Sequence, residues 1–98
     1  MSFKPVTVTT TIEPVVTYNP KRKGVALFNN GTVTVFVSQD PSNVASDGFP
    51  VAASVAIIFS SEDDDEPELA LYAVTESGSA DCRVQESIGR AEVNNEAV

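Results

Sequence analysis

The stretch 25–38, VALFNNGTVTVFVS, sets two runs of β-branched and aromatic residues on either side of Asn29-Asn30-Gly31, the strongest turn signal in the chain. A loop of Asn30-Gly31 alone would give both faces of the resulting hairpin a mixed character. A three-residue loop with Gly31 in the left-handed conformation separates the faces, because a shift of one residue moves every side chain across the sheet. We therefore predict a hairpin closed by the three-residue turn.

The two faces of this predicted hairpin differ in character. One face carries Val25, Leu27, Val33, Val35 and Val37, and the other carries Ala26, Phe28, Thr34 and Phe36. The first face is wholly aliphatic and is expected to point into the core. The second bears two phenylalanines, and we expect another subunit or the N-terminal arm to cover them.

Further short runs resemble strands along the rest of the chain. They are 5–12, 15–18, 55–59, 69–74 and 80–87. The first carries proline and outward threonines that suit a sheet edge, the third favours a buried strand, and the last two predict a second hairpin. No helical periodicity exceeds one turn. About seven or eight short strands indicate an all-β fold, an antiparallel, jelly-roll-like β-sandwich, with a small barrel as the alternative.

The 98 residues suffice for one domain, which we expect to be a sandwich over 1–87 that includes an N-terminal strand or arm. The segment 88–98 loses the strand pattern and is expected to be a C-terminal tail. The segment 39–50 is rich in turn residues and predicts an irregular connection. The segment 61–68, SEDDDEPE, holds six carboxylates and predicts a solvated loop, with calcium binding as the weaker alternative.

The sequence offers little for catalysis. It has no histidine and no glycine-rich phosphate loop, and its one cysteine, Cys82, alternates with Ala80 and Val84 as a core residue would. Carboxylates such as Glu13 and Glu76 could form a hydrolytic pair, but so short a chain leaves little room for a desolvated cleft. We expect no enzyme activity, no cofactor and no metal site.

Charge and hydropathy bear on partners. The net charge of −8 and the isoelectric point near 4.2 argue against nucleic acid, whose binding needs lysine and arginine to neutralise phosphates. No charged-then-apolar leader follows Met1, and the weakly polar stretch 51–59 is too short to cross a bilayer. We expect neither a nucleic-acid partner nor a membrane partner.

The turn 19–24, NPKRKG, holds half of the six cationic side chains. It is either a solvated turn or a contact with an acidic neighbouring surface. Residues proposed from sequence as a protein interface are Lys21, Arg22 and Lys23 in this turn, together with the two phenylalanines Phe28 and Phe36.

Six motifs follow one another along about 15–86. They are Asn19-Pro20-Lys21-Arg22, Leu27-Phe28-Asn29-Asn30-Gly31, Val33-Thr34-Val35-Phe36-Val37, Gly48-Phe49-Pro50-Val51, Leu71-Tyr72-Ala73-Val74 and Cys82-Arg83-Val84-Gln85-Glu86. Their order resembles small β-sandwich structural proteins encoded among the virion genes of tailed phages and archaeal tailed viruses. The acidic loop 62–66 and the tail after Glu86 depart from that pattern.

The resemblance implies a non-enzymatic particle component, either a capsid decoration (cement) protein or an accessory piece of a tail or fibre. Its partners would be the major capsid protein or another virion protein, and further copies of itself in a homo-oligomer such as a trimer. It would reside on the capsid surface after assembly in the host cytoplasm. The rival is a displayed carbohydrate- or receptor-binding module, for which Tyr18, Phe49 and Tyr72 are the aromatic candidates.

Overall fold

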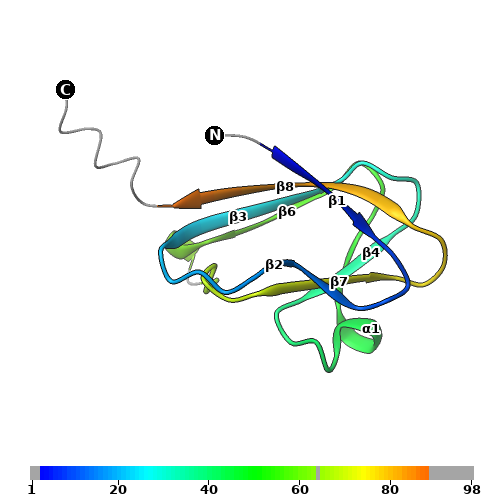
Figure 1. Cartoon of the computed structure of the whole chain (residues 1–98), viewed down its shortest axis with the longest axis horizontal. Helices are drawn as coiled ribbons and strands as arrows, with labels where there is room; N and C mark the ends of the chain where they lie inside the picture. The colour runs from blue at the N-terminus through cyan, green and yellow to red at the C-terminus, as the bar shows by residue number, and fades with distance from the viewer. Residues whose placement is uncertain (1–2, 64, 89–98) are drawn as a thin grey trace.

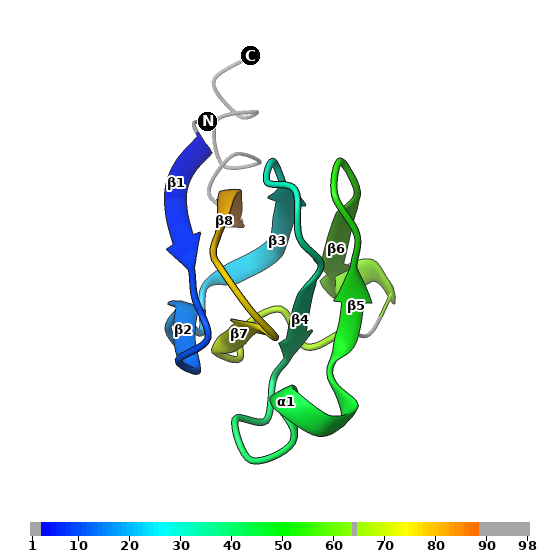
Figure 2. The same cartoon turned by 90° about the vertical axis from the view of Figure 1, so that its right-hand side faces the viewer.

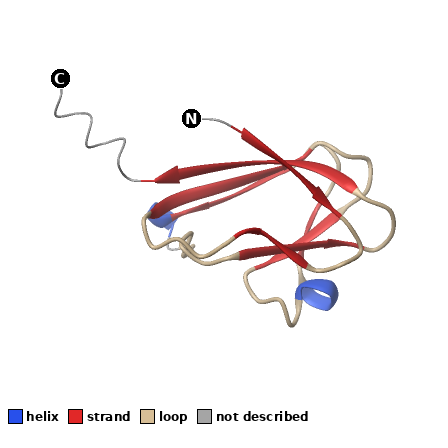
Figure 3. Ribbon diagram, viewed as in Figure 1, coloured by secondary structure: helices blue, strands red, loops and turns tan. Residues whose placement is uncertain are grey.

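The computed structural model describes residues 3–63 and 65–88, and its architecture is almost entirely β (Figure 3). The strands are β1 (Phe3–Val8), β2 (Glu13–Val16), β3 (Arg22–Asn29), β4 (Val35–Ser38), β5 (Phe49–Val51), β6 (Ala56–Ser60), β7 (Leu71–Thr75) and β8 (Ala80–Ile88). A one-turn helix α1 (Val44–Asp47) precedes β5, and a 3-10 turn η1 (Ser61–Asp63) follows β6.

The strands form two antiparallel four-stranded sheets, stacked as the upper and lower layers of Figure 1. Sheet A has the order β1-β8-β3-β6 and sheet B the order β2-β7-β4-β5. Strand β1 therefore pairs with β8, β2 with β7, β3 with β6 and β4 with β5. This nesting is the eight-stranded jelly roll, which confirms the predicted all-β sandwich and its jelly-roll-like character.

The core lies between the two sheets and is built from the alternate residues of their inner faces. Its buried members are Val8, Val15, Val16, Val25, Leu27, Val35, Val37, Val51, Leu71, Ala73, Ala80, Cys82 and Val84. The inward positions predicted for 25–37 are thus confirmed, since Val33 packs against the same cluster. Cys82 is fully buried beside Ala80 and Val84, as its alternation indicated.

The predicted hairpin over 25–38 is wrong, because β3 belongs to sheet A and β4 to sheet B. The connection between them is a corner held by Asn29. The buried Asn29 amide donates to the carbonyls of Val33 and Val51 at 2.8 and 2.9 Å, and its Oδ1 accepts the Gly31 N–H at 2.9 Å. Asn29 ends β3 of sheet A, and its side chain satisfies main-chain groups of the corner and of β5 in sheet B where the chain changes layer.

Gly31 serves this corner by its small size. Its φ is not in the left-handed region, contrary to the predicted turn; within the described chain, Gly78 is the glycine that has positive φ. A Cβ on Gly31 would lie 2.9 Å from the Cα and Cβ of Ala80, where β8 begins. The glycine is therefore needed for close packing against β8.

The second predicted hairpin is wrong for the same reason, since β7 lies in sheet B and β8 in sheet A. The chain turns between them at Gly78, whose φ is +71°, and the Thr75 hydroxyl donates to the Gly78 carbonyl at 2.8 Å. In a jelly roll the consecutive strands mostly alternate between layers, so a tight turn between two strand patterns need not close a hairpin.

Helix α1 lies on the outer side of sheet B, the side away from sheet A (Figures 1 and 2). It contacts β4 and β7, and its Val44 is fully buried there. Val74, on the outer side of β7 beside Phe36, is buried too, although neither Val44 nor Val74 belongs to the core between the sheets. The turn-rich connection 39–50 thus covers sheet B.

Two boundaries differ from the sequence predictions. Ile88 pairs with Arg22 and ends β8, so it belongs to the sandwich, while the rest of the predicted tail, 89–98, lies outside the described residues. Ile12 follows β1 and is exposed, so the predicted strand 5–12 ends earlier, at Val8.

The acidic segment is a loop between β6 and β7, as predicted, with Asp64 outside the described residues. In the described chain no helix is long and apolar enough to span a membrane.

Candidate functional site

The outer face of sheet A is apolar across several strands. The register aligns Phe3 of β1, Gln85 of β8, Ala26 of β3 and Ile58 of β6 in one row, and Pro5, Arg83, Phe28 and Ala56 in the next. Phe3 is 60% exposed and Ile58 67% exposed. Side chains that would suit a core therefore face outward here, and the described residues leave them uncovered.

These rows enclose an open hollow of about 490 Å³. It is lined by Phe3, Ala26, Phe28, Asn30, Ala56, Ile58, Arg83 and Gln85. Ala26 lies at its floor inside the sheet, because its short side chain stands between Gln85 of β8 and Ile58 of β6. A broad apolar depression with a few polar groups at its border has the composition of a protein or ligand docking surface.

The polar border of the hollow is held by an ion pair. The Arg83 guanidinium donates to Asp81 Oδ2 at 2.9 Å, and the Asn30 amide donates to the same oxygen at 3.3 Å. These bonds, Arg83 first and Asn30 second, lower the pKa of the Asp81 carboxyl. The two charges cancel, so this border adds no net charge to the face despite the chain's net charge of −8.

The two phenylalanines proposed from sequence do not share a face. Phe28 lies on the outer side of sheet A and borders the hollow. Phe36 lies on the outer side of sheet B, close to the end of α1. A Cβ added to Gly48 there would lie 3.2 Å from the Phe36 Cβ. The single two-phenylalanine surface is therefore wrong, and Phe28 alone keeps the proposed interface position.

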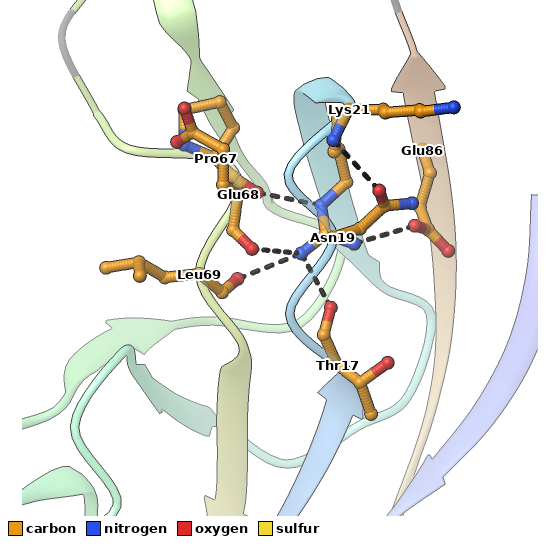
Figure 4. Close-up of polar contacts among 8 residues, drawn as sticks. Thr17, Asn19, Lys21, Pro67, Glu68, Leu69 and Glu86 are labelled. Carbon is orange, nitrogen blue, oxygen red and sulfur yellow. Dashed lines mark hydrogen bonds and ion pairs between the residues drawn. The ribbon is translucent and has the colours of Figure 1, made fainter.

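Arg22 is also corrected, because its side chain is 1% exposed and cannot meet a partner. It donates through Nε to the Pro67 carbonyl at 2.7 Å, through Nη1 to Glu86 Oε1 at 2.8 Å, and through Nη2 to the Thr17 and Leu69 carbonyls at 2.9 Å each. Figure 4 shows these acceptors converging from three segments. Arg22 ties the start of β3 to the acidic loop and to β8, so its role is structural.

Lys21 and Lys23 flank Arg22 in the sequence and are exposed. The Asn19 side chain accepts the Lys21 main-chain N–H at 3.0 Å, which fixes the turn. In Figure 4 the Lys21 side chain extends away from the segment 67–69. Two separated lysines are thus the part of the predicted basic surface that a partner could reach.

The remaining candidate groups do not gather into a reactive site among the described residues. Burial, with the Asp81 charge second, raises the pKa of Cys82 to about 11, so its thiol is protonated at neutral pH. In residues 3–63 and 65–88, no three acidic or cysteine side chains lie close enough to hold a metal ion. Tyr18 and Phe49 are exposed on separate parts of the molecule, whereas Tyr72 is half-buried.

Sequence reasoning missed most of the hollow. Phe3 and Ile58 were not singled out, and the run containing Ile58 was interpreted as a buried strand although β6 is a sheet edge. The available signal was alternation: in the run 80–87, Arg83 and Gln85 alternate with Cys82 and Val84, so they face the other side of the strand. A strand whose outward residues include such long polar side chains marks the exposed face of its sheet.

Comparison with protein-family models, with curated proteins and with solved structures yields no match to this chain.

Proposed function

We propose that this chain is a non-enzymatic structural protein of a virus particle, a capsid decoration protein that binds the shell through the outer face of sheet A. The observation that carries the proposal is the contrast between the covered outer face of sheet B and the apolar, uncovered outer face of sheet A. An apolar hollow with a charge-neutral polar border suits a protein partner. Its partner is the major capsid protein or another virion protein.

Two further observations support a particle role. The order of turn and strand motifs resembles small virion proteins of tailed viruses, and the eight-stranded jelly roll is an architecture that viral shell domains use. The second is an analogy of fold, which by itself carries no function. A tail or fibre accessory protein would use the same face, so the location on the particle is the part of the proposal that imaging decides.

Binding to particles that lack this protein tests the proposal, with a matched pair of variants. Phe3 and Phe49 are 60% and 59% exposed, but only Phe3 borders the hollow. We expect Phe3→Ser to weaken cosedimentation with the shells by about 10- to 100-fold, and Phe49→Ser to bind as the parent does. Electron microscopy of decorated shells then locates the bound chain. Equal binding by all three proteins would contradict the proposed face.

A carbohydrate-binding module is the second candidate, and one observation favours it. Phe3 and Phe28 lie beside the amides of Asn30 and Gln85 and the guanidinium of Arg83, the mixture of aromatic and hydrogen-bonding groups that a sugar needs. If Gln85→Leu loses glycan-array binding but still cosediments with the shells, the hollow is assigned to a sugar. Shell binding with no glycan signal would favour decoration.

A further inference from the structure

The free edges of the two sheets are protected unequally. An edge strand exposes unpaired main-chain groups, and proline, charge or short length prevents other strands from pairing with them. β1 carries Lys4 and Pro5, β2 carries Glu13 and Pro14, and β5 has three residues with Pro50 at its centre. The fourth edge, β6, reads AIIFS and has neither proline nor charge.

The register with β3 shows which main-chain groups of β6 are free. The Asn29 N–H donates to the Val55 carbonyl at 2.9 Å, and bonded and non-bonded pairs alternate along an antiparallel ladder. Ile57 and Phe59 therefore direct their N–H and C=O groups toward β3. Ala56, Ile58 and Ser60 direct theirs toward the free edge.

Ser60 is already satisfied within the chain. Its N–H donates to Asp65 Oδ2 at 3.0 Å, and its carbonyl accepts the Asp65 N–H at 3.2 Å. Asp65 thus closes the end of the β6 edge and supports the register assignment. Among the described residues, Ala56 and Ile58 remain as the next outward positions, each offering one donor and one acceptor.

We propose that β6 pairs antiparallel with β6 of a second copy, about a two-fold axis at Ile57. Ala56 of each chain then exchanges both main-chain hydrogen bonds with Ile58 of the other, and Ile57 lies opposite Ile57 of the second copy. Sheet A becomes a continuous eight-stranded sheet across the dimer. The pairing is self-complementary, as a two-fold interface requires.

Charge placement selects a second copy in this orientation. Glu62, Asp65 and Glu66 follow β6 directly, whereas the segment 52–55 before it, AASV, is uncharged. Antiparallel pairing sets the acidic loop of each chain beside the uncharged segment of the other. A parallel arrangement would bring the two acidic loops together and add repulsion between chains that each carry −8.

Side chains add apolar burial to the backbone bonds. Ile58 is 67% exposed on the outer side and would cover Ala56 of the second copy, since directly opposed residues share a face. Ile57 and Phe59 are partly buried against the core, and on that side Ile57 would meet its equivalent across the axis. The dimer therefore joins the two hollows along one outer surface.

Analytical ultracentrifugation of the full chain from micromolar to millimolar concentration tests the pairing. We expect the mass to rise from 10.4 kDa toward twice that value. Ile58→Lys places a charge on the edge and should weaken dimerisation by about tenfold or more. Phe3→Lys adds the same charge to the same sheet face at its opposite edge, and should dimerise as the parent does. Ala56→Pro, which removes an outward N–H, is a second edge variant.

Amide hydrogen exchange distinguishes edge pairing from other contacts. We expect the N–H groups of Ala56 and Ile58 to gain protection as concentration rises, while that of Ile57, already bonded to β3, changes little. A parent chain that stays monomeric at millimolar concentration overturns the proposal. So does a dimer abolished by Phe3→Lys, which indicates face stacking, or by ending the chain at Ile88, which indicates a contact through 89–98. These measurements need no particle, so they stand or fall independently of the decoration role.

Discussion

The outer faces of the two sheets show how similar strand patterns reach different environments. β3 and β4 both alternate buried aliphatic residues with half-buried outward ones, and each presents a phenylalanine outward. Over sheet B the connection 39–50 folds back as α1, which contacts β4 and β7 and buries Val44. Sheet A receives no such cover from the described residues. The chain itself covers one outer face, and the other is the face that the proposed function assigns to a partner.

Charging the cover of sheet B should produce the largest effect. The Val44 side chain is fully buried, whereas that of its neighbour Ala45 on α1 is exposed. We expect Val44→Asp to lower the free energy of unfolding by about 3 to 5 kcal/mol, because it buries an unpaired carboxylate. Ala45→Asp should leave it nearly unchanged. Urea denaturation measures both.

A weaker variant keeps this test usable if Val44→Asp fails to fold. Val44→Ala removes two methyl groups and should cost about 2 kcal/mol. If Val44→Ala and Ala45→Asp unfold at the same urea concentration as the parent, α1 is not a stabilising cover and the contrast between the faces fails.

Two glycines compare the packing of the faces at the level of a single methyl group. A Cβ on Gly48, which follows α1, would lie 2.3 Å from the Val44 carbonyl oxygen, while one on Gly24 in sheet A would find its nearest atom at 3.4 Å. We expect Gly48→Ala to destabilise the fold by about 1 to 3 kcal/mol. Gly24→Ala should fall within about 0.5 kcal/mol of the parent. Thermal unfolding followed by circular dichroism measures the difference, and equal melting temperatures would contradict it.

The sequence predicts the strands and their inward residues well because alternation depends on the chain's own geometry. It cannot predict the strand pairing. Alternation with a period of two residues shows which side chains face the core, but not which strand lies next to a given strand. Asn29-Asn30-Gly31 illustrates the limit: the same asparagine and glycine chemistry serves a hairpin turn and a corner between sheets. The corner depends on the Val51 carbonyl and on Ala80, both distant in sequence.

The candidate site was less predictable than the fold. Arg22 looks like part of a basic surface because its neighbours in the sequence are lysines. Yet most of its acceptors are main-chain carbonyls, at Thr17 and in 67–69, which no side-chain pattern reveals. Phe28 and Phe36 look equivalent because both point away from the core, but the outer faces of two sheets are different surfaces. Ile58 looks like core because its run is apolar, while its place at an edge follows only from strand order.

The smallest expected effect concerns the ion pair bordering the hollow of sheet A. The pKa of Asp81 lies below its usual range because the ionised carboxylate accepts bonds from Arg83 and then Asn30. A lowered folded-state pKa stabilises the fold above the pKa of the unfolded carboxyl, and this contribution is lost as the pH falls through the folded value. Because the pair is solvent-exposed, we expect little change in stability but a measurable change in titration.

Replacing Arg83 with glutamine should raise the pKa of Asp81 toward its ordinary value, as followed by the carboxyl carbon shift in an NMR titration. Asp40 is the internal control, because its pKa is lowered by the N–H and hydroxyl of Ser42. Its titration should not move. An unchanged Asp81 titration in Arg83→Gln would mean that Asn30 alone holds the carboxylate. The guanidinium would then be free to meet a partner, and the border of the hollow would carry separate charges that a docking protein must match.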